Sequence, residues 1–357
     1  MNVALAGLPL AGKTCLFTAL SQGAVDSAAN PARPEHPNAA MVALPDARLD
    51  WLAEHYGSKK RTHVQVEFLD LPGLAPGRPD LAAQNTAIME HLRRADALVC
   101  VLRAFDSPRV PGKADPRADR AALHAEFLLS DLDTTLRRIE KLEKQVTKPS
   151  ADRDAARKEL EFLARCRQAL EAEQPLHGLA HTDAERAILR GFASLTEKPM
   201  LTVLNVGEDH AGRPAEAAAA YPDLGPAVAL CASLEAEIAQ LPPADRAPFM
   251  AELGLDRLHA PDVALGVHQA LDRITFFTEN EKEAAARSLP RGGTAVQAAA
   301  EVHTDMASGF VRAEVVNFQD LQKAGSVKQA RADGHVRMEG RDYVVRDGDV
   351  ILFHFTR

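Results

Sequence analysis

The sequence predicts an α/β fold built on parallel strands, and three stretches carry that prediction. The apolar run Asn2–Ala6 leads into the loop GLPLAGKT at residues 7–14, after which a helix can begin without a breaker. The alternating run 64–70 ends in an aspartate, and the apolar run 200–205 ends in an asparagine. Strands that end in polar residues and are joined by helices are typical of parallel sheets, whose carboxyl edge carries the ligand site.

Composition bounds the remaining possibilities. With 357 residues and 46% hydrophobic residues, the chain is long enough for two or three packed domains. A net charge of −8 argues against a protein that coats nucleic acid by bulk electrostatics. The four cysteines form no CxxC pair, which argues against a zinc site, and no apolar run is long enough to span a membrane. Since no basic leader precedes the first strand, we expect a cytoplasmic protein; the sequence leaves its oligomeric state open.

The first loop has the chemistry of a phosphate-binding loop. Gly7 and Gly12 allow the backbone N–H groups to approach a phosphate that a Cβ would block. Lys13 would reach the β- and γ-phosphates, and the Thr14 hydroxyl would bind Mg²⁺. The predicted nucleotide-binding residues of this loop are Leu8, Pro9, Leu10, Ala11, Gly12, Lys13, Thr14 and Cys15.

A second element, D-x-x-G, follows the strand that ends at Asp70. We expect Asp70 to be the carboxylate on the Mg²⁺ side and the Gly73 N–H to contact a γ-phosphate. The next residue is Leu74, in the catalytic position where many nucleotide-hydrolysing switch proteins carry a water-orienting glutamine. Its side chain has no donor or acceptor.

A third motif is expected to contact the base of the bound nucleotide. After Asn205 the sequence reads N-x-x-E, with Val206 where a guanine-specific protein has lysine and Glu208 where it has aspartate. Asn205 can pair with the N7 and N6 edge of adenine, whereas Glu208 is set too far out to copy that aspartate. Ser233 and Leu234 lie in a stretch that matches the loop closing over the base in this fold.

Two further segments have patterns of their own. Apolar residues from Leu129 to Val146 recur every three or four positions, which predicts one helix of a coiled-coil hairpin, broken at Pro149-Ser150 and followed by a return helix. In the C-terminal part, Thr294 is a predicted N-cap of a short helix, and the turn 347–349 precedes a last strand.

Taken together, these motifs resemble the YchF or Obg-like ATPase family of P-loop proteins. The stretches that carry the resemblance are GLPLAGKTCLFTAL, FLDLPGL, LNVGED, FFTENEKEAAARSLPRGGTAVQAAAEVHTDMASGFVRAEVVNFQDL and EGRDYVVRDGDVILFHF. The resemblance implies a G-type P-loop domain, an inserted helical hairpin, a C-terminal β-grasp (TGS, ubiquitin-like) domain, a preference for ATP over GTP, and binding to the ribosome. The expected limits are 1–127 with 191–275, then 128–190, and 276–357.

Two departures from the family pattern leave the function open. Pro34 stands where the family has a threonine that binds Mg²⁺, and residues 75–84 are poorer in glycine than the family's second switch. We therefore expect a slow Mg²⁺-dependent ATPase acting as a switch at the ribosome in translation or stress. The alternatives are a nucleotide-binding scaffold with little or no hydrolysis, or a GTPase.

Overall fold

The computed structural model describes residues 1–25, 31–110, 112–147, 153–179 and 181–356. It forms two compact units. One comprises Met1–Ala40 and Glu67–Val263, and the other comprises Met41–Val66 and Ala264–Arg357. Each unit contains most or all of one six-stranded sheet.

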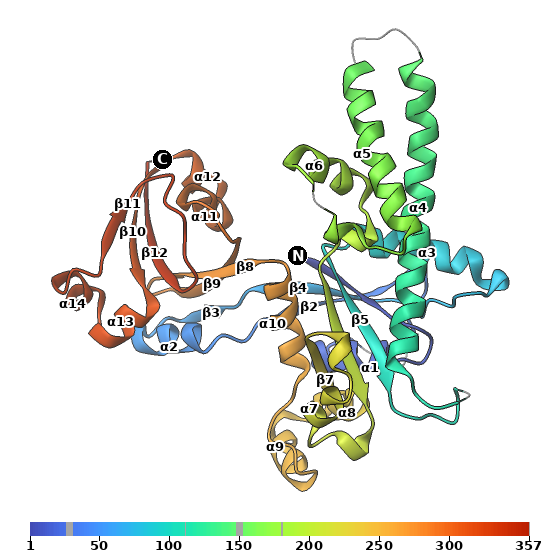
Figure 1. Ribbon diagram of the computed structural model, residues 1–357. Coiled ribbons are helices and arrows are strands. Elements are labelled where there is room, and N and C mark those ends of the chain that lie inside the picture. The colour runs from blue at the N-terminus through green and yellow to red at the C-terminus, as the bar shows by residue number, and fades with distance from the viewer. Residues whose placement is uncertain (26–30, 111, 148–152, 180, 357) are drawn as a thin grey trace. The chain divides into compact units, whose positions relative to one another are not determined.

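The first sheet has the strand order β2-β4-β1-β5-β6-β7, and all pairings from β4 through β7 are parallel. The central strand β5 is buried along almost its whole length, as expected where helices cover both faces of a parallel sheet. The predicted parallel α/β class is thereby confirmed (Figure 1). The strands are β1 (Asn2–Ala6), β2 (Asn38–Ala43), β4 (Gln65–Asp70), β5 (Ala97–Ala104), β6 (Met200–Val206) and β7 (Ala227–Leu230).

Helices of this unit follow the strands or extend from the sheet. They are α1 (Lys13–Leu20), α3 (Ala82–Arg94), α4 (Pro116–Val146), α5 (Arg153–Glu171), α6 (Asp183–Phe192), α7 (Pro214–Ala219), α8 (Ala232–Gln240) and α9 (Pro243–Glu252); α10 (Ala260–Ala270) continues into the second unit. None of the helices formed by the described residues is both long and apolar enough to cross a bilayer.

The predicted hairpin is formed by α4 and α5, which run side by side (Figure 1). The helix α4 begins earlier than expected, because Pro116 occupies the first helical position and Asp115 accepts hydrogen bonds from two N–H groups of the first turn. The prediction that Leu129 and Leu136 lie in the buried seam of this hairpin was wrong, because these residues are 62% and 37% exposed. The predicted break at Pro149-Ser150 lies outside the described residues.

In its first half, the seam that α4 uses lies one position before the predicted one, whereas Ile139 and Leu142 of the predicted seam are buried as expected. Its buried residues include Leu128, Asp131, Thr135 and Ile139. Asp131 accepts hydrogen bonds from the backbone N–H groups of Leu195 and Thr196 at 2.9 and 2.8 Å. This buried carboxylate fixes the helix rotation, so an apolar pattern alone could not select the face.

The second unit holds a sheet of order β11-β10-β12-β8-β9-β3. Its strands are β3 (Lys60–Thr62), β8 (Arg273–Glu279), β9 (Glu283–Pro290), β10 (Phe310–Asn317), β11 (Arg337–Glu339) and β12 (Asp349–Phe355); its helices are α2 (Ala47–Tyr56), α11 (Ala295–Val302), α12 (Thr304–Ser308), α13 (Phe318–Ala324) and α14 (Val327–Ala332). Thr294 precedes α11 as predicted, and its N–H donates to Gln297 Oε1 at 2.8 Å.

Strand β3 lies in the sheet of the second unit. It pairs in parallel with β9, so residues 41–66 belong to the compact unit of the C-terminal strands rather than to the unit of the phosphate-binding loop. Short strands that join a distant partner leave no local signal in the sequence. The three-domain limits given above stay a prediction.

Candidate nucleotide-binding site

The phosphate-binding loop joins β1 to α1, as the sequence predicts. Gly12 caps the helix with a φ of 93°, a conformation that favours glycine. A Cβ at Gly12 would lie 2.0 Å from Nδ2 of Asn205, so the position has no room for a side chain. The loop therefore needs glycine for both its backbone conformation and its packing.

Lys13 is buried at the start of α1, with 5% of its surface exposed. Its Nζ donates to the carbonyl oxygens of Gly7 and Leu8 at 3.2 and 2.9 Å. Burial lowers the pKa of Lys13 to about 8, and the nearby Asp70 carboxylate opposes that shift. The lysine is thus held inside the loop that would surround a phosphate.

Thr14 and Asp70 meet across the site. The Thr14 hydroxyl donates to Asp70, with its Oγ1 at 3.0 Å from Oδ2 and 3.3 Å from Oδ1. Asp70 is fully buried, and burial raises its pKa although Thr14, Lys13 and Asn38 favour the charged form. A hydroxyl and a carboxylate side by side are hard oxygen donors, which is the ligand type that Mg²⁺ binds beside phosphates.

The D-x-x-G segment packs tightly on the phosphate-binding loop. A Cβ at Gly73 would lie 2.4 Å from the backbone nitrogen of Pro9. The Leu74 N–H donates to the Gly7 carbonyl oxygen at 3.1 Å, while its side chain is 1% exposed and belongs to the core. Leu74 therefore brings no side-chain group to the cavity.

Asn205 connects the end of β6 with two other segments. Its Nδ2 donates to the Ala11 carbonyl oxygen, and its Oδ1 accepts from the Ala232 N–H, both at 2.9 Å. Only 3% of the residue is exposed. The predicted contact with adenine stays a prediction. It would use the same amide atoms of Asn205 that already form hydrogen bonds with the backbone of Ala11 and Ala232.

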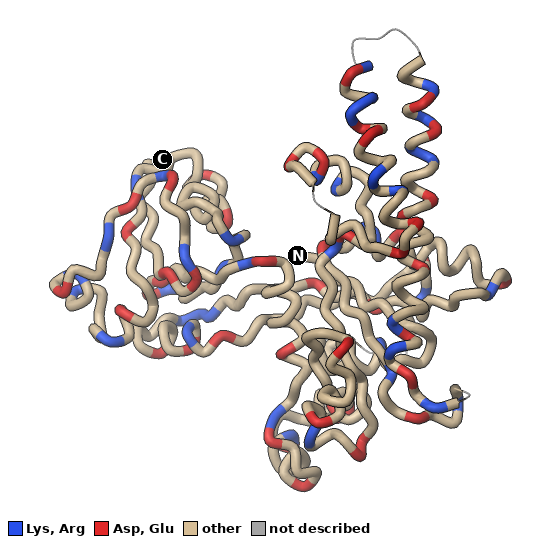
Figure 2. The backbone as a smooth tube through the Cα atoms, in the orientation of Figure 1, with Lys and Arg blue, Asp and Glu red and all other residues tan. Residues whose placement is uncertain are grey.

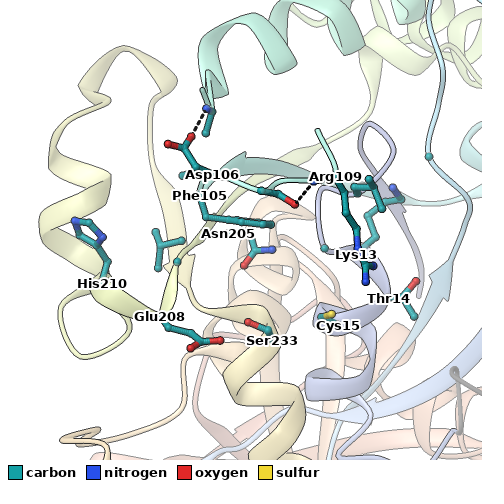
Figure 3. A pocket seen from close by; sticks show the side chains of 18 of the residues that line it. Lys13, Thr14, Cys15, Phe105, Asp106, Arg109, Asn205, Glu208, His210 and Ser233 are labelled. Atoms are coloured by element: carbon teal, nitrogen blue, oxygen red, sulfur yellow. Dashed lines mark hydrogen bonds between the residues drawn. The ribbon is translucent and has the colours of Figure 1, made fainter. Parts of the chain in front are cut away.

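A cavity of about 1070 Å³ opens at this edge of the sheet (Figure 3). Many predicted residues lie together on its wall: Leu10, Gly12, Lys13, Thr14, Cys15, Gly73, Asn205, Val206, Glu208 and Ser233. Other predicted residues are not part of the wall: Leu8, Pro9, Ala11, Asp70, Leu74 and Leu234.

The predicted base-closing loop is a helix instead. Ser233 and Leu234 lie in the first turn of α8, which begins at Ala232 because the Asn205 side chain binds its N–H group. Ser233 lines the cavity, whereas Leu234 is buried in the core. The spacing of the buried apolar residues in this stretch is the sequence signal for the helix.

One side of the cavity is formed by residues that the sequence motifs did not predict. The loop after β5 contributes Phe105, Asp106, Ser107, Arg109, Lys113 and Ala114, and other such residues are Leu71, Pro72, Ala104, Gly207, Asp209, His210 and Tyr221. The position of the loop was the available signal, because ligands of parallel sheets bind at the carboxyl ends of strands.

The two departures from the family pattern have structural counterparts. The Pro34 carbonyl oxygen accepts from His91 Nε2 at 2.9 Å, and Pro34 does not line the cavity. At the start of the segment 75–84, the Asn85 side chain binds both the N–H and the carbonyl oxygen of Ala75, at 3.1 and 2.9 Å. The side chain of Asn85 thereby holds the first residue of that segment in place.

A glycine loop between strand and helix, a buried lysine and a Thr14–Asp70 pair define a P-loop nucleotide-binding protein. Residues 2–148 match the family model MMR_HSR1, described as 50S ribosome-binding GTPase, and residues 273–356 match YchF-GTPase_C, described as a protein of unknown function (DUF933). The chain belongs to the YchF and Obg-like ATPase family.

Curated relatives match over the full length. The Ribosome-binding ATPase YchF of Bacillus subtilis (strain 168) is 33% identical, with coverage of 100% of this chain and 99% of the relative. That of Escherichia coli O157:H7 is 35% identical over 99% and 98%, and the Caenorhabditis elegans Obg-like ATPase 1 is 30% identical over 100% and 92%. The solved structure of the Schizosaccharomyces pombe YchF GTPase superposes with a TM-score of 0.84 at 26% identity, over 99% and 97% of the two chains.

Proposed function

We propose that the chain is a Mg²⁺-dependent P-loop enzyme that hydrolyses ATP slowly, prefers ATP over GTP, and acts as a cytoplasmic switch at the ribosome. The observation that carries the proposal is the intact set of Lys13, Thr14 and Asp70 beside a cavity of nucleotide size. A scaffold that had lost its chemistry would have no need of a buried lysine, which is costly to keep.

Mg²⁺ would be held by Thr14 and Asp70, whose oxygens already lie 3.0 Å apart. When bound, the ion neutralises charge on the β- and γ-phosphates. Lys13 would leave its two carbonyl partners and donate to the phosphates, while the N–H groups of the loop orient them. These groups bind and orient the triphosphate.

The proposed preference for ATP rests on the absence of the aspartate and the lysine that guanine-specific sites use to bind the base. Guanine-specific sites accept the N1 and N2 protons with an aspartate, whereas this site has the exposed Glu208 on the cavity wall. Val206 is 2% exposed, so it offers no long stem to cover the base as a lysine would. A site without those partners loses most of the affinity difference by which guanine nucleotides would be preferred.

Slow turnover follows from the groups around the γ-phosphate. The buried Leu74 offers no polar atom to orient water, and Pro34 has no hydroxyl. Unassisted switch proteins that rely on positioning alone turn over on the order of 10⁻⁴ to 10⁻² s⁻¹. We expect a rate in that range.

Association with the ribosome is supported by the names of the relatives, which are ribosome-binding ATPases. Both signs of charge are interleaved along α4 and α5 (Figure 2), so phosphate contacts would be made by single basic side chains rather than by a basic face. The hairpin and the sheet of the second unit are the surfaces that we propose for this contact. Co-sedimentation with ribosomes, with and without nucleotide, tests it.

The central experiment is a calorimetric titration of ATP, ADP, GTP and GDP with Mg²⁺, paired with a hydrolysis assay. We expect ATP to bind more tightly than GTP, and Lys13→Ala to lose both binding and hydrolysis. Binding without hydrolysis above the Lys13→Ala background would support the scaffold alternative. Tight GTP binding by the unaltered chain would support the GTPase alternative.

A further inference from the structure

A second cavity, of about 240 Å³, lies within the second unit. Its wall combines the segment that leads into α2, the C-terminal half of α10, the hairpin of β8 and β9, and the turn before β12. It shares no residue with the nucleotide cavity, and none of the site residues predicted from the sequence lies on it. The cavity is therefore a separate candidate site with its own chemistry.

The charges on this wall do not balance. Three arginines line the cavity, Arg48, Arg273 and Arg291, against two aspartates, Asp46 and Asp347. Both aspartates are engaged by the same arginine, because Arg48 Nη2 lies 2.8 Å from Asp46 Oδ2 and Arg48 Nη1 lies 2.7 Å from Asp347 Oδ2. The other two arginines are left without a carboxylate from the wall.

Arg273 stands at the start of β8 and is partly buried. Its Nε donates to Ser288 Oγ at 2.6 Å, and its Nη2 donates to the Ser288 carbonyl oxygen at 3.1 Å. Both acceptors are neutral, and among the residues that the structure describes no carboxylate forms an ion pair with this guanidinium. A partly buried charge without a counter-ion is unfavourable, so an anion in the cavity would stabilise it.

Arg291 follows β9 and lies beside Arg273 in the hairpin. Arg273 pairs with Pro290 in the strand register, and the Arg291 N–H donates to the Asp272 carbonyl oxygen at 2.9 Å. The Arg291 Nε is engaged at 2.7 Å from Asp272 Oδ1, whereas its two Nη groups donate no hydrogen bond within the described part of the chain. Two guanidinium groups with unused donors therefore line one cavity.

We propose that this cavity binds a phosphate group, which accepts hydrogen bonds from the Nη groups of Arg273 and Arg291. The planar fork of a guanidinium matches two oxygens of one phosphate, and charge-assisted hydrogen bonds of this kind are strong. With less than a quarter of the volume of the nucleotide cavity, the site has room for free phosphate or for the phosphate monoester of a small molecule. His268 on the same wall adds no charge at neutral pH, because burial lowers the pKa of its imidazole.

Such a ligand would contact parts of the second unit that are far apart in the sequence. The wall includes Leu44 and Pro45 ahead of α2 as well as Leu265 on α10. A ligand that binds the folded unit and not the unfolded chain stabilises the folded unit by mass action. Amide hydrogen exchange around the cavity should therefore slow when phosphate binds, whether or not the chain hydrolyses ATP.

The test measures hydrogen exchange of the full-length chain at residues 44–48, 264–275 and 286–291, with inorganic phosphate, glycerol phosphate or sodium chloride at equal ionic strength. We expect both phosphates to slow exchange there and sodium chloride to leave it unchanged. Tighter binding of glycerol phosphate would identify a phosphate monoester as the ligand, and tighter binding of inorganic phosphate would identify the free ion. None of these probes needs ATP, so a failure of the proposed ATPase function would not change the result.

Arg291→Ala is the decisive variant, because this side chain is 63% exposed and its loss leaves the bonds between Arg273 and Ser288 in place. It should weaken phosphate binding by about tenfold, and Arg273→Ala should weaken it at least as much. Thermal denaturation must first establish that Arg273→Ala folds. The matched control is Arg331→Ala, which removes an arginine that is 59% exposed in the same unit and does not line the cavity; it should bind phosphate like wild type.

Three outcomes would overturn the proposal. Equal slowing of exchange by sodium chloride would assign the effect to ionic strength. Wild-type phosphate affinity in Arg291→Ala would mean that the phosphate lies outside this cavity. Protection confined to the loop at residues 7–14 would assign the phosphate to the nucleotide site alone.

Discussion

The Asn205 side chain lies against Gly12 and binds the neighbouring Ala11 carbonyl oxygen at 2.9 Å, so the end of β6 supports the phosphate-binding loop directly. The same side chain accepts from the Ala232 N–H at the start of α8. One buried amide thus connects the loop that would bind phosphate with the helix beside the base. Because Asn205 supports the phosphate-binding loop, its loss should change the affinity for every nucleotide that the loop binds.

Replacing Asn205 with alanine should therefore weaken ATP and GTP equally. Two buried backbone groups, the Ala11 carbonyl and the Ala232 N–H, would lose their partners, at about 1–3 kcal/mol of unfolding free energy each. Urea denaturation and calorimetric titration measure the two effects. Glu208→Ala is the control, since it alters the cavity wall and should leave unfolding unchanged. A loss confined to ATP, with normal stability, would instead assign Asn205 to the adenine base.

Gly73→Ala should distort the phosphate-binding loop. The new Cβ would lie 2.4 Å from the backbone nitrogen and 2.5 Å from the Cα of Pro9, and backbone atoms cannot turn aside as a flexible side chain can. We expect a loss of about 1–3 kcal/mol in unfolding free energy and at least roughly a tenfold loss in ATP affinity. In Gly191→Ala, by contrast, the Cβ meets nothing within 4 Å, so that helical variant should match or slightly exceed wild-type stability. Unchanged ATP affinity in Gly73→Ala would contradict the packing argument.

The parts of this site that could be predicted from the sequence are those whose motifs lie within a short stretch of the chain. The glycine loop, the strand ending at Asp70 and the strand before Val206 each have a spacing that their own residues determine. The loop carrying Arg109 has no such spacing, and only its place after β5 brings it to the cavity.

Contacts between residues far apart in the sequence explain the other differences between the predicted and the observed structure. The face of α4 was predicted from the recurrence of leucines, yet the buried Asp131 decides which face turns inward, and its partner Thr196 is 65 residues away in the sequence. Strand β3 joins β9 across more than two hundred residues. Pairings of this kind depend on the assembled fold and not on neighbouring residues.

Nucleotide affinity should fall at alkaline pH because of Lys13. Burial lowers the pKa of this ammonium to about 8, so the cation that would bind the phosphates is lost as the pH rises through that value. Above it, ATP affinity should drop by up to about tenfold per pH unit until other groups titrate. Titrations between neutral and alkaline pH measure the slope. Lys13→Arg keeps its charge throughout and should give a flat profile, and a flat profile in wild type would count against the lysine–phosphate contact.

Stability of the second unit should depend on His268 in weakly acidic solution. Burial lowers the pKa of this imidazole below its ordinary 6.5, with Arg273 and Arg48 acting in the same direction and Asp347 and Asp46 opposing them. The folded state therefore favours the neutral ring, which lies 2.9 Å from Ser288 Oγ. This contribution is complete above pH 6.5 and is lost as the pH falls through the lowered folded-state pKa.

The measurement is the urea-unfolding free energy as a function of pH. Wild type should lose up to about 1.4 kcal/mol per pH unit from this group below pH 6.5, and His268→Gln should remove that slope. His303→Gln, which changes a side chain that is 61% exposed, should keep the wild-type profile. An unchanged slope in His268→Gln would assign the acid sensitivity to other groups.

The choice of base can be tested by rebuilding the guanine signature. Val206→Lys with Glu208→Asp supplies the long stem and the shorter acid that guanine recognition needs, so the ratio of GTP to ATP affinity should rise by about 10- to 100-fold. Glu208→Asp alone is the control and should shift the ratio less, because the base remains uncovered. Val206 is buried, so thermal denaturation must first establish that the double variant folds. A folded double variant with an unchanged ratio would show that other residues of the cavity wall choose the base, and the proposed reason for the ATP preference would then be wrong.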